Sequence, residues 1–149
     1  MEYTLREASE TDRKFLYGLH CQTMRELIIK TWGWDEEWQV KDFDDRFRLC
    51  EVSVIQCHGC DAGAVFLRIN PETIFIEELQ ILPEYQSQGI GSAVVRQLIE
   101  RARFRGATVT LSVLPINVRA KELYERLGFE VISVEVPFIR MCHRCSESG

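Results

Sequence analysis

The feature that most constrains this chain is a segment with two glycines, which stands between a strand pattern and a helix pattern. The segment is Gln86-Ser87-Gln88-Gly89-Ile90-Gly91-Ser92. The first N–H groups of a helix have no partner within the helix, and they form the positive end of its dipole. Because glycine has no Cβ atom, Gly89 and Gly91 would let a phosphate approach those groups closely. The segment therefore predicts a pyrophosphate-binding turn, and a strand-to-helix turn that only requires glycine is the alternative.

The patterns around this segment predict a mixed α/β fold. Apolar residues recur at helical spacing after Ser9, Asp35, Gly89 and Asn117, three of which are residues that cap helices well. Apolar runs bounded by Gly, Pro and Asn predict strands. The expected strands are residues 4–8, 51–56, 62–69, 73–82, 108–114, 129–135 and 136–142. The order β-α-α-β-β-β-α-β-α-β-β describes a sheet with helices packed on its faces.

Composition is typical of an ordinary globular protein. The 149 residues fit one domain, 1–149, and the chain is 46% hydrophobic and 28% charged. A net charge of −5 argues against nucleic-acid binding, which depends on Lys and Arg to neutralise phosphates. The chain does not open with a basic segment followed by an apolar one, and its apolar runs are too short for a membrane span. We therefore expect a cytoplasmic protein with no membrane partner.

Residues 86–92 resemble the signature loop of the GNAT superfamily of N-acetyltransferases, Gln/Arg-x-x-Gly-x-Gly/Ala. The segment from Leu79 to Tyr85 is similar to the strand that leads into that loop. The segment from Asn117 to Phe129 is similar to the family's Asn…Ala…Leu-Tyr-x-x-x-Gly-Phe pattern. The resemblance implies a central mixed, mostly antiparallel sheet of about seven strands with about four flanking helices. It also implies transfer of the acetyl group of acetyl-CoA to a primary amine, by direct attack in a ternary complex and without a metal.

The resemblance also implies which residues bind acetyl-CoA. Backbone groups of Leu79 and Ile81, with Gln80 between them, are expected to pair with the pantetheine arm like an added strand. The residues expected at the pyrophosphate are Gln86, Ser87, Gln88, Gly89, Ile90, Gly91 and Ser92. Asn117 is expected to contact the cofactor, and capping a helix is an equally good role for it. Family members often carry Arg or Lys in this loop, whereas this chain does not, so backbone amides must carry most of the anion binding.

Two residues are expected to move protons. Tyr124 is the expected acid, because a phenol with a pKa of about 10 can give its proton to a departing thiolate whose thiol has a pKa of about 8.5. Its alternative role is that of a core aromatic. Glu77 is the expected base, on a strand face where desolvation would raise its pKa. Glu78 lies on the opposite face and is the expected substrate contact, although the resemblance does not settle which of the two acids is the base.

The resemblance implies that the region between the first two helices shapes the acceptor pocket, and in this chain Trp32, Trp34 and Trp38 stand there close to three acids, residues 35–37. Aromatic rings and carboxylates together suit a cation. A small cationic amine and a peptide or protein amine both fit this pattern, and a helix hairpin with buried tryptophans is the alternative. The length of the acyl chain and the formation of a homodimer stay open.

Two other classes of function fit parts of the sequence. An acyl-CoA-binding module without turnover would keep the phosphate-binding turn but lack an aligned acid and base. A zinc-binding interaction domain would use Cys57, Cys60, Cys142 and Cys145, whose paired spacing is typical of zinc ligands. In the expected strand order several strands, at about 4.8 Å each, separate the two pairs. We therefore expect no metal and mostly reduced thiols.

Overall fold

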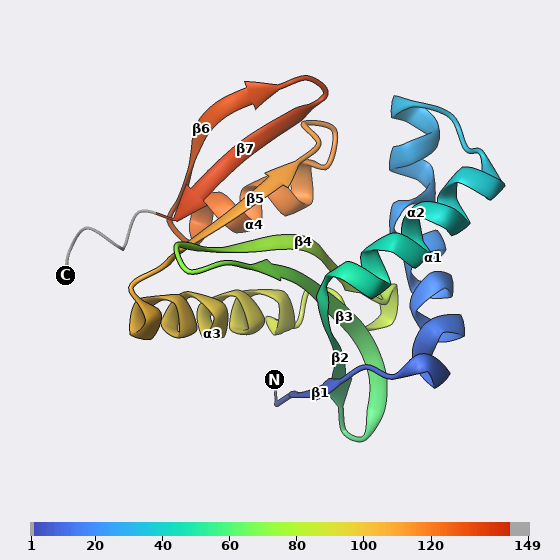
Figure 1. The fold of residues 1–149 in the computed structure, drawn as a ribbon, viewed down its shortest axis with the longest axis horizontal. Coiled ribbons are helices and arrows are strands. Elements are labelled where there is room, and N and C mark those ends of the chain that lie inside the picture. Colours follow the sequence, from blue (N-terminus) through green and yellow to red (C-terminus); the bar gives the residue numbers. More distant parts are fainter. Residues whose placement is uncertain (1, 144–149) are drawn as a thin grey trace. The chain divides into compact units, whose positions relative to one another are not determined.

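The computed structural model describes residues 2–143, and its elements follow the predicted order (Figure 1). The strands are β1 (Thr4–Glu7), β2 (Glu51–Cys57), β3 (Cys60–Ile69), β4 (Thr73–Ile81), β5 (Thr108–Val113), β6 (Phe129–Glu135) and β7 (Phe138–His143). The helices are α1 (Arg13–Thr31), α2 (Glu36–Leu49), α3 (Ile90–Arg105) and α4 (Val118–Arg126), with short 3₁₀ turns at Glu10–Asp12 and Pro83–Tyr85. Within residues 2–143, no helix has both the length and the apolar character that a membrane span requires.

The strands form one sheet in the order β1-β2-β3-β4-β5-β7-β6. The pairs β1–β2, β2–β3, β5–β7 and β6–β7 are antiparallel, whereas β4 and β5 are parallel. The predicted fold class, a mixed and mostly antiparallel sheet with four helices, is confirmed. The strand ends lie within two residues of the predicted ones.

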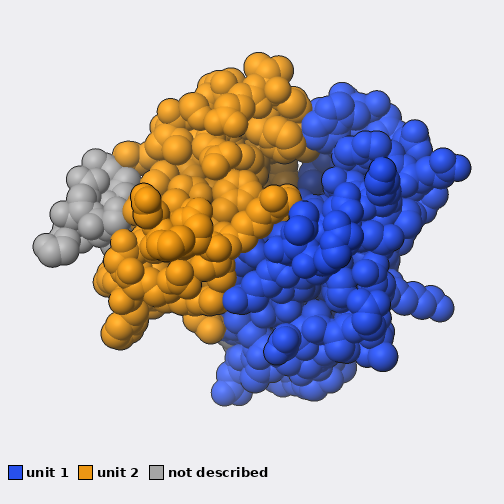
Figure 2. Space-filling view, in the orientation of Figure 1, with its two compact units in different colours: residues 1–67, 78–91 blue, residues 68–77, 92–149 orange. Residues whose placement is uncertain are grey.

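The chain divides into two compact units, which Figure 2 colours separately. Unit 1 consists of residues 1–67 and 78–91, and unit 2 consists of residues 68–77 and 92–149. Strand β4 belongs to both, because the boundary between the units falls between Glu77 and Glu78.

The core of unit 1 lies between its two long helices and one face of its strands. Its central cluster consists of Leu16, Leu19, Phe43, Val52, Val54, Ala64 and Phe66. The helix positions are one turn apart and the strand positions alternate, which is the spacing that places each set on one face. The rings of Phe43 and Phe66 meet edge to face, with 6.2 Å between their centroids. Helices α1 and α2 therefore pack directly on β2 and β3.

Gly63 fixes the distance between β3 and the end of β4. A Cβ atom at this position would overlap the carbonyl oxygen of Gln80. Next to this contact, the N–H of Leu82 donates to the carbonyl of Ala62 at 2.8 Å. Only glycine permits this approach, so the backbone around Gln80 is held against β3.

Unit 2 is built on the first part of β4 and on β5, β7 and β6. The parallel register runs from Thr73 opposite Thr108 to Ile76 opposite Leu111. Strand β5 then pairs with β7, which pairs with β6 after a tight turn. Helix α4 lies behind these strands in Figure 1. Its N-cap is Asn117, as predicted, because the Asn117 side chain accepts a hydrogen bond from the N–H of Ala120.

A buried carboxylate holds the turn that precedes α1. Asp12 accepts hydrogen bonds from both terminal nitrogens of Arg6, at 2.9 and 2.8 Å, and from the N–H of Ser9 at 2.8 Å. The bond to Ser9 is part of a capping box, in which Ser9 is the N-cap residue. The Arg6 guanidinium and the Ser9 amide lower the pKa of Asp12 from 3.8 to about 2.

We expect Asp12→Asn to lower the free energy of unfolding at pH 7 by about 1–2 kcal/mol, because an amide cannot accept both bonds from the guanidinium. The pKa of Asp12 is lower in the folded state than in the unfolded state. The stabilisation is therefore present above about pH 4 and is lost as the pH falls toward 2. Urea unfolding of both proteins at pH 7 and pH 2.5 measures the difference, which should shrink at about pH 2.5. An equal difference at both pH values would contradict the ionic role of Asp12.

Candidate functional site

Strand β4 carries two neighbouring carboxylates, Glu77 and Glu78. Because side chains alternate along a strand, the two point to opposite faces. The buried residues of β4 are Ile74, Ile76 and Gln80. Glu78 has the same parity as these three residues, so it lies on the more buried face of the strand.

Glu78 is bound by two side chains of unit 1. Its Oε2 lies 3.2 Å from Nη1 of Arg46, a buried arginine of α2 whose Nε also bonds Oδ2 of Asp42 at 3.0 Å. Its Oε1 accepts a hydrogen bond from Nε2 of Gln80 at 3.0 Å. About a fifth of the Glu78 side chain remains exposed (21%). Burial raises the pKa of Glu78 above its usual value, although Arg46 and Gln80 act in the opposite direction.

Gln80 in turn contacts a buried histidine of α1. Its Nε2 lies 3.2 Å from Nδ1 of His20, and Nε2 of His20 lies 3.0 Å from Oε1 of Gln39. Burial lowers the pKa of His20, so the neutral ring is favoured. In that ring Nε2 carries the hydrogen and donates to Gln39, whereas Nδ1 accepts from Gln80. The sequence does not single out His20 or Gln39. The available signal is that His20 stands four residues after Leu16, on the buried face of α1.

Glu77 has a different environment, within unit 2. Its Oε2 lies 3.3 Å from Nε of Arg68, a half-exposed arginine. Phe75, on the same face of β4, is covered by the guanidinium of Arg140, which lies 4.8 Å from the ring centroid. The role of Glu77 as the base stays a prediction. Burial raises the pKa of Glu78, the neighbouring carboxyl on the other face of β4.

The predicted phosphate-binding turn leads directly into α3. Gly89 has a φ of 84°, which side chains rarely adopt, and Ser87 has a φ of 63°. A Cβ atom at Gly89 would have no neighbour within 4 Å. Helix α3 begins at Ile90 and has no acidic residue in its first turn. The space next to Gly89 is therefore open, and the first turn of α3 adds no negative charge where an anion is expected.

Two glutamines of this turn make internal hydrogen bonds. Nε2 of Gln86 donates to the carbonyl of Ile81 at 2.8 Å, and Nε2 of Gln88 donates to the carbonyl of Glu84 at 3.0 Å. The Gln86 side chain therefore holds the turn against the end of β4, and the Gln88 side chain holds it against the preceding 3₁₀ turn. Contact of these residues with a pyrophosphate stays a prediction.

Tyr124 lies on α4 and is buried, with 7% of its surface exposed. Its ring packs edge to face on Phe129, with 5.5 Å between the centroids. Only a small part of the side chain is therefore accessible. Its role as the acid stays a prediction, as does contact of Asn117 with the cofactor.

The tryptophans between α1 and α2 lie in different environments. The ring of Trp34 is 6.0 Å from that of His20, and the guanidinium of Arg25 lies 4.8 Å from its centroid. Its Nε1 donates to Glu36 at 2.9 Å. Trp32 and Trp38 are exposed, at 56% and 59%. Trp34 is only partly buried, so the alternative of a hairpin with buried tryptophans is wrong.

The cysteine pairs are separated in the strand order. Cys57 and Cys60 are opposite residues of the β2–β3 hairpin, whereas Cys142 lies on β7, with β4 and β5 between β3 and β7. Cys145 lies outside the described residues. Over residues 2–143, no group of three or more His, Cys, Asp or Glu side chains is placed to hold a metal ion.

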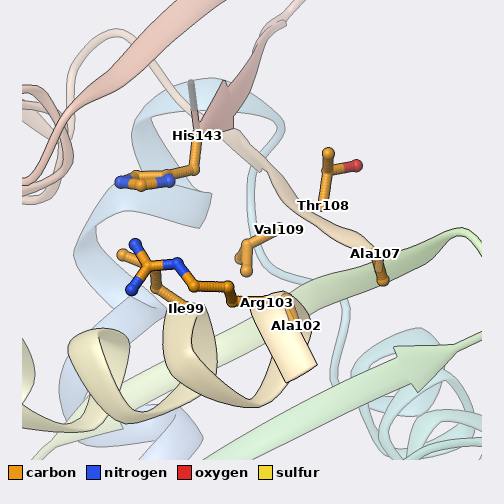
Figure 3. Close-up of a pocket in the computed structure, with 7 residues that line it drawn as sticks. All are labelled: Ile99, Ala102, Arg103, Ala107, Thr108, Val109 and His143. Atoms are coloured by element: carbon orange, nitrogen blue, oxygen red, sulfur yellow. The ribbon is translucent and has the colours of Figure 1, made fainter. Parts of the chain in front are cut away.

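Unit 2 contains a small cavity of about 20 Å³ (Figure 3). Its lining residues are Ile99, Ala102, Arg103, Ala107, Thr108, Val109 and His143. The His143 ring projects from the end of β7 and donates through Nε2 to the carbonyl of Leu127 at 3.0 Å. The volume suits about one water molecule. None of the predicted site residues lines this cavity, so it is not the candidate site.

The fold, together with the glycine turn between β4 and α3, defines the class of acyltransferases that the sequence predicts. The family model described as "Acetyltransferase (GNAT) family" matches residues 14–129, and the chain belongs to this family.

Relatives and solved structures agree with this assignment. An uncharacterised N-acetyltransferase of Methanocaldococcus jannaschii is 30% identical over 151 residues, which cover 95% of this chain and 67% of the relative. The ribosomal protein bS18-alanine N-acetyltransferase of Escherichia coli K12 is 37% identical over 67 residues, 44% of each chain. The crystal structure of PaiA N-acetyltransferase from Thermoplasma acidophilum in complex with coenzyme A has a TM-score of 0.79. It covers 97% of this chain and 99% of that chain at 16% identity, so it shows a shared fold.

Proposed function

We propose that this protein transfers the acetyl group of acetyl-CoA to a primary amine. The observation that carries the proposal is the open, acid-free turn at Gly89, which precedes α3 in a chain of the GNAT family. Backbone N–H groups at a helix start bind phosphate oxygens without a basic side chain. The residues that would hold the pyrophosphate are those of the turn, 87–92, and the backbone of Leu79 and Ile81 would pair with the pantetheine arm.

The acceptor must be neutral when it attacks, so a base has to take a proton from the ammonium group. The raised pKa of Glu78 supports Glu78 as this base, because a carboxyl titrating closer to neutral pH is better matched to proton transfer. This assignment reverses the one that the sequence suggests, in which Glu77 is the base. Glu77 then becomes the candidate substrate contact. Tyr124 is proposed as the acid that protonates the leaving thiolate.

The proposed acceptor is a primary amine, either of a small cation or of a peptide or protein. One relative acts on the alanine of a ribosomal protein, which supports a protein amine. Trp32 is the exposed aromatic side chain proposed to contact the acceptor. Trp34 is a weaker candidate for binding a cation, because Arg25 already covers one face of its ring. Release of free thiol from acetyl-CoA in the presence of a panel of amines and N-terminal peptides tests the activity directly.

Acetyl-CoA should raise the melting temperature of the wild-type protein, because a ligand that binds only the folded state stabilises it by about 2.7 kcal/mol at 100 times its Kd. Gly89→Val should remove this shift, since valine is strained at a φ of 84° and its side chain would cover the helix N–H groups. Gly106→Val is the matched control, with a φ of 70° after the other end of α3. Calorimetry should give weaker binding only for Gly89→Val. Equal affinities in all three proteins would refute the phosphate-binding turn.

Tyr124→Phe should lower kcat by roughly 10²-fold and leave the Kd for acetyl-CoA nearly unchanged, because it removes one hydroxyl and little packing area. Steady-state kinetics and calorimetry measure the two quantities. Tyr3→Phe removes the same group from the N-terminal segment and serves as the control. Unchanged turnover in Tyr124→Phe would leave this residue as a core aromatic.

Substitutions of Glu77 and Glu78 should have different effects, one on the chemical step and the other on substrate binding. If Glu78 is the base, kcat/KM falls as the pH drops through its raised pKa, and Glu78→Gln lowers kcat and removes this acid limb. Glu77→Gln should instead raise the KM for the amine and leave kcat largely unchanged, the sign of lost uniform binding. Full pH profiles of kcat/KM for the three proteins test the assignment. If Glu78→Gln left kcat and the pH profile unchanged while Glu77→Gln removed the fall of kcat/KM at low pH, Glu77 would be the base.

A further inference from the structure

The β2–β3 hairpin has a cysteine on each side of its turn. Cys57 is the last residue of β2 and Cys60 is the first residue of β3, and the two lie opposite each other in the register. The two residues between them, His58 and Gly59, have φ angles of 52° and 79°. Positive φ at both central positions defines a type I′ turn, whose twist matches that of the flanking strands. The turn therefore holds the two cysteines in one fixed register.

This register gives the two cysteines the geometry that a disulfide requires. Opposite residues of an antiparallel pair have their side chains on the same face of the sheet. When the two residues flank a two-residue turn they form a hydrogen-bonded pair, whose Cα atoms lie about 5.5 Å apart. A disulfide requires a Cα separation of about 4.4–6.8 Å and Cβ atoms that do not point apart. The sulfurs of Cys57 and Cys60 can therefore be joined without a change in the hairpin backbone.

The surroundings of the sulfurs agree with this placement. Burial raises the pKa of Cys57, and the charge of the Cys60 thiolate raises it further. Burial also raises the pKa of Tyr85, and a hydrogen bond to Cys60 and the charges of both cysteines act in the same direction. The two sulfurs therefore lie close to each other and to one phenol. Tyr85 directly precedes Gln86, so the pair stands beside the segment that leads into the glycine turn.

The two thiols differ in their access to solvent. Cys57 is 1% exposed, whereas Cys60 is an exposed residue. The thiolate is the form of cysteine that attacks a disulfide, and burial disfavours that form at Cys57. An oxidant in solution therefore reaches the sulfur of Cys60 first, and Cys57 can react only with a partner that Cys60 brings to it.

Two other roles explain the pair less well. A metal ion would need further ligands, and among residues 2–143 no group of three or more His, Cys, Asp or Glu side chains is placed to hold one. A permanent disulfide would close a loop with only two residues between the cysteines, and the stabilisation that a disulfide gives falls as its loop becomes shorter. The geometry therefore suits a bond that forms and breaks better than it suits a structural link.

We propose that Cys57 and Cys60 form a redox-modification site, at which a small disulfide such as glutathione disulfide converts the two thiols into one disulfide. The Cys60 sulfur attacks one sulfur of glutathione disulfide, whose S–S bond breaks, and the first glutathione leaves with the Cys60 proton. The Cys57 sulfur then attacks the Cys60 sulfur of this mixed disulfide, and the second glutathione leaves with the Cys57 proton. Two protein thiols are oxidised, and one glutathione disulfide is reduced to two glutathione molecules.

Mass spectrometry of the folded, full-length protein tests the proposal. The reduced protein is incubated with glutathione disulfide, its remaining thiols are blocked with N-ethylmaleimide, and it is then digested with trypsin. The peptide of residues 49–68 contains Cys57, Cys60 and one further cysteine, Cys50. In the wild type we expect this peptide to lose two hydrogen atoms, to carry a Cys57–Cys60 bond and to retain no glutathione.

Three variants separate the roles of the cysteines. Cys57→Ser lacks the thiol for the second step, so glutathione should stay on Cys60. In Cys60→Ser the buried Cys57 should remain a free thiol, because no exposed partner starts the exchange. Cys50→Ser is the matched control within the same peptide, and its Cys57–Cys60 bond should form as in the wild type.

A wild-type peptide that stays reduced, keeps glutathione on Cys60, or joins either cysteine to Cys50 overturns the proposal. Glutathione on Cys57 in Cys60→Ser also overturns it, because the buried thiol would then react on its own. The wild-type result decides even where a variant fails to fold. Since the measurement uses neither acetyl-CoA nor turnover, its failure is distinct from a failure of the proposed function.

Discussion

The interior of unit 1 depends on one constraint, the burial of the Arg46 guanidinium. Its side chain is only 7% exposed, and a charge removed from water is costly unless opposite charges and hydrogen bonds surround it. Asp42, one turn earlier on α2, supplies one carboxylate, and Glu78 on β4 supplies the other. Because the second partner comes from the sheet, the ion pair ties α2 to β4. It also fixes the carboxylate of Glu78 where the Gln80 amide can reach it.

Two contacts hold the backbone at the end of β4 in place. Gly63 lets β3 approach the carbonyl of Gln80 more closely than any other residue would, and the Gln86 side chain holds the carbonyl of Ile81. The strand end is therefore fixed on two sides before it enters the glycine turn. A site that must orient both a base and an anion gains from such rigidity, because misplacement by about 1 Å can cost about 10²-fold in rate.

Most of the fold could be predicted from the sequence, because local signals and tertiary packing agree. Asp35 and Asn117 cap helices where the pattern places them, and the glycine turn precedes α3.

The faces of β4 could not be predicted. Apolar residues occur at both parities of that strand, so alternation does not decide which face is buried. Phe75 lies on the less buried face, where Arg140 covers its ring, a contact across 65 positions that no local pattern reveals. The contact between His20 and Gln80 could not be predicted for the same reason, because 60 residues separate them.

Stability alone does not explain the polar interior of unit 1. Where α1 and α2 meet the sheet, the core is otherwise made of Leu, Val, Ala and Phe, and buried ionic or polar groups can often be replaced by apolar ones without loss of stability. His20 is hydrogen-bonded to both Gln39 and Gln80, yet these bonds offset little more than the desolvation of the groups that make them. An apolar core could not fix the orientation of the Glu78 carboxylate. The Gln80 amide nitrogen donates both to His20 and to Glu78, and with Arg46 it fixes the orientation of that carboxylate. Departures from the simple core pattern are expected at functional sites, and here they converge on one partly exposed acid.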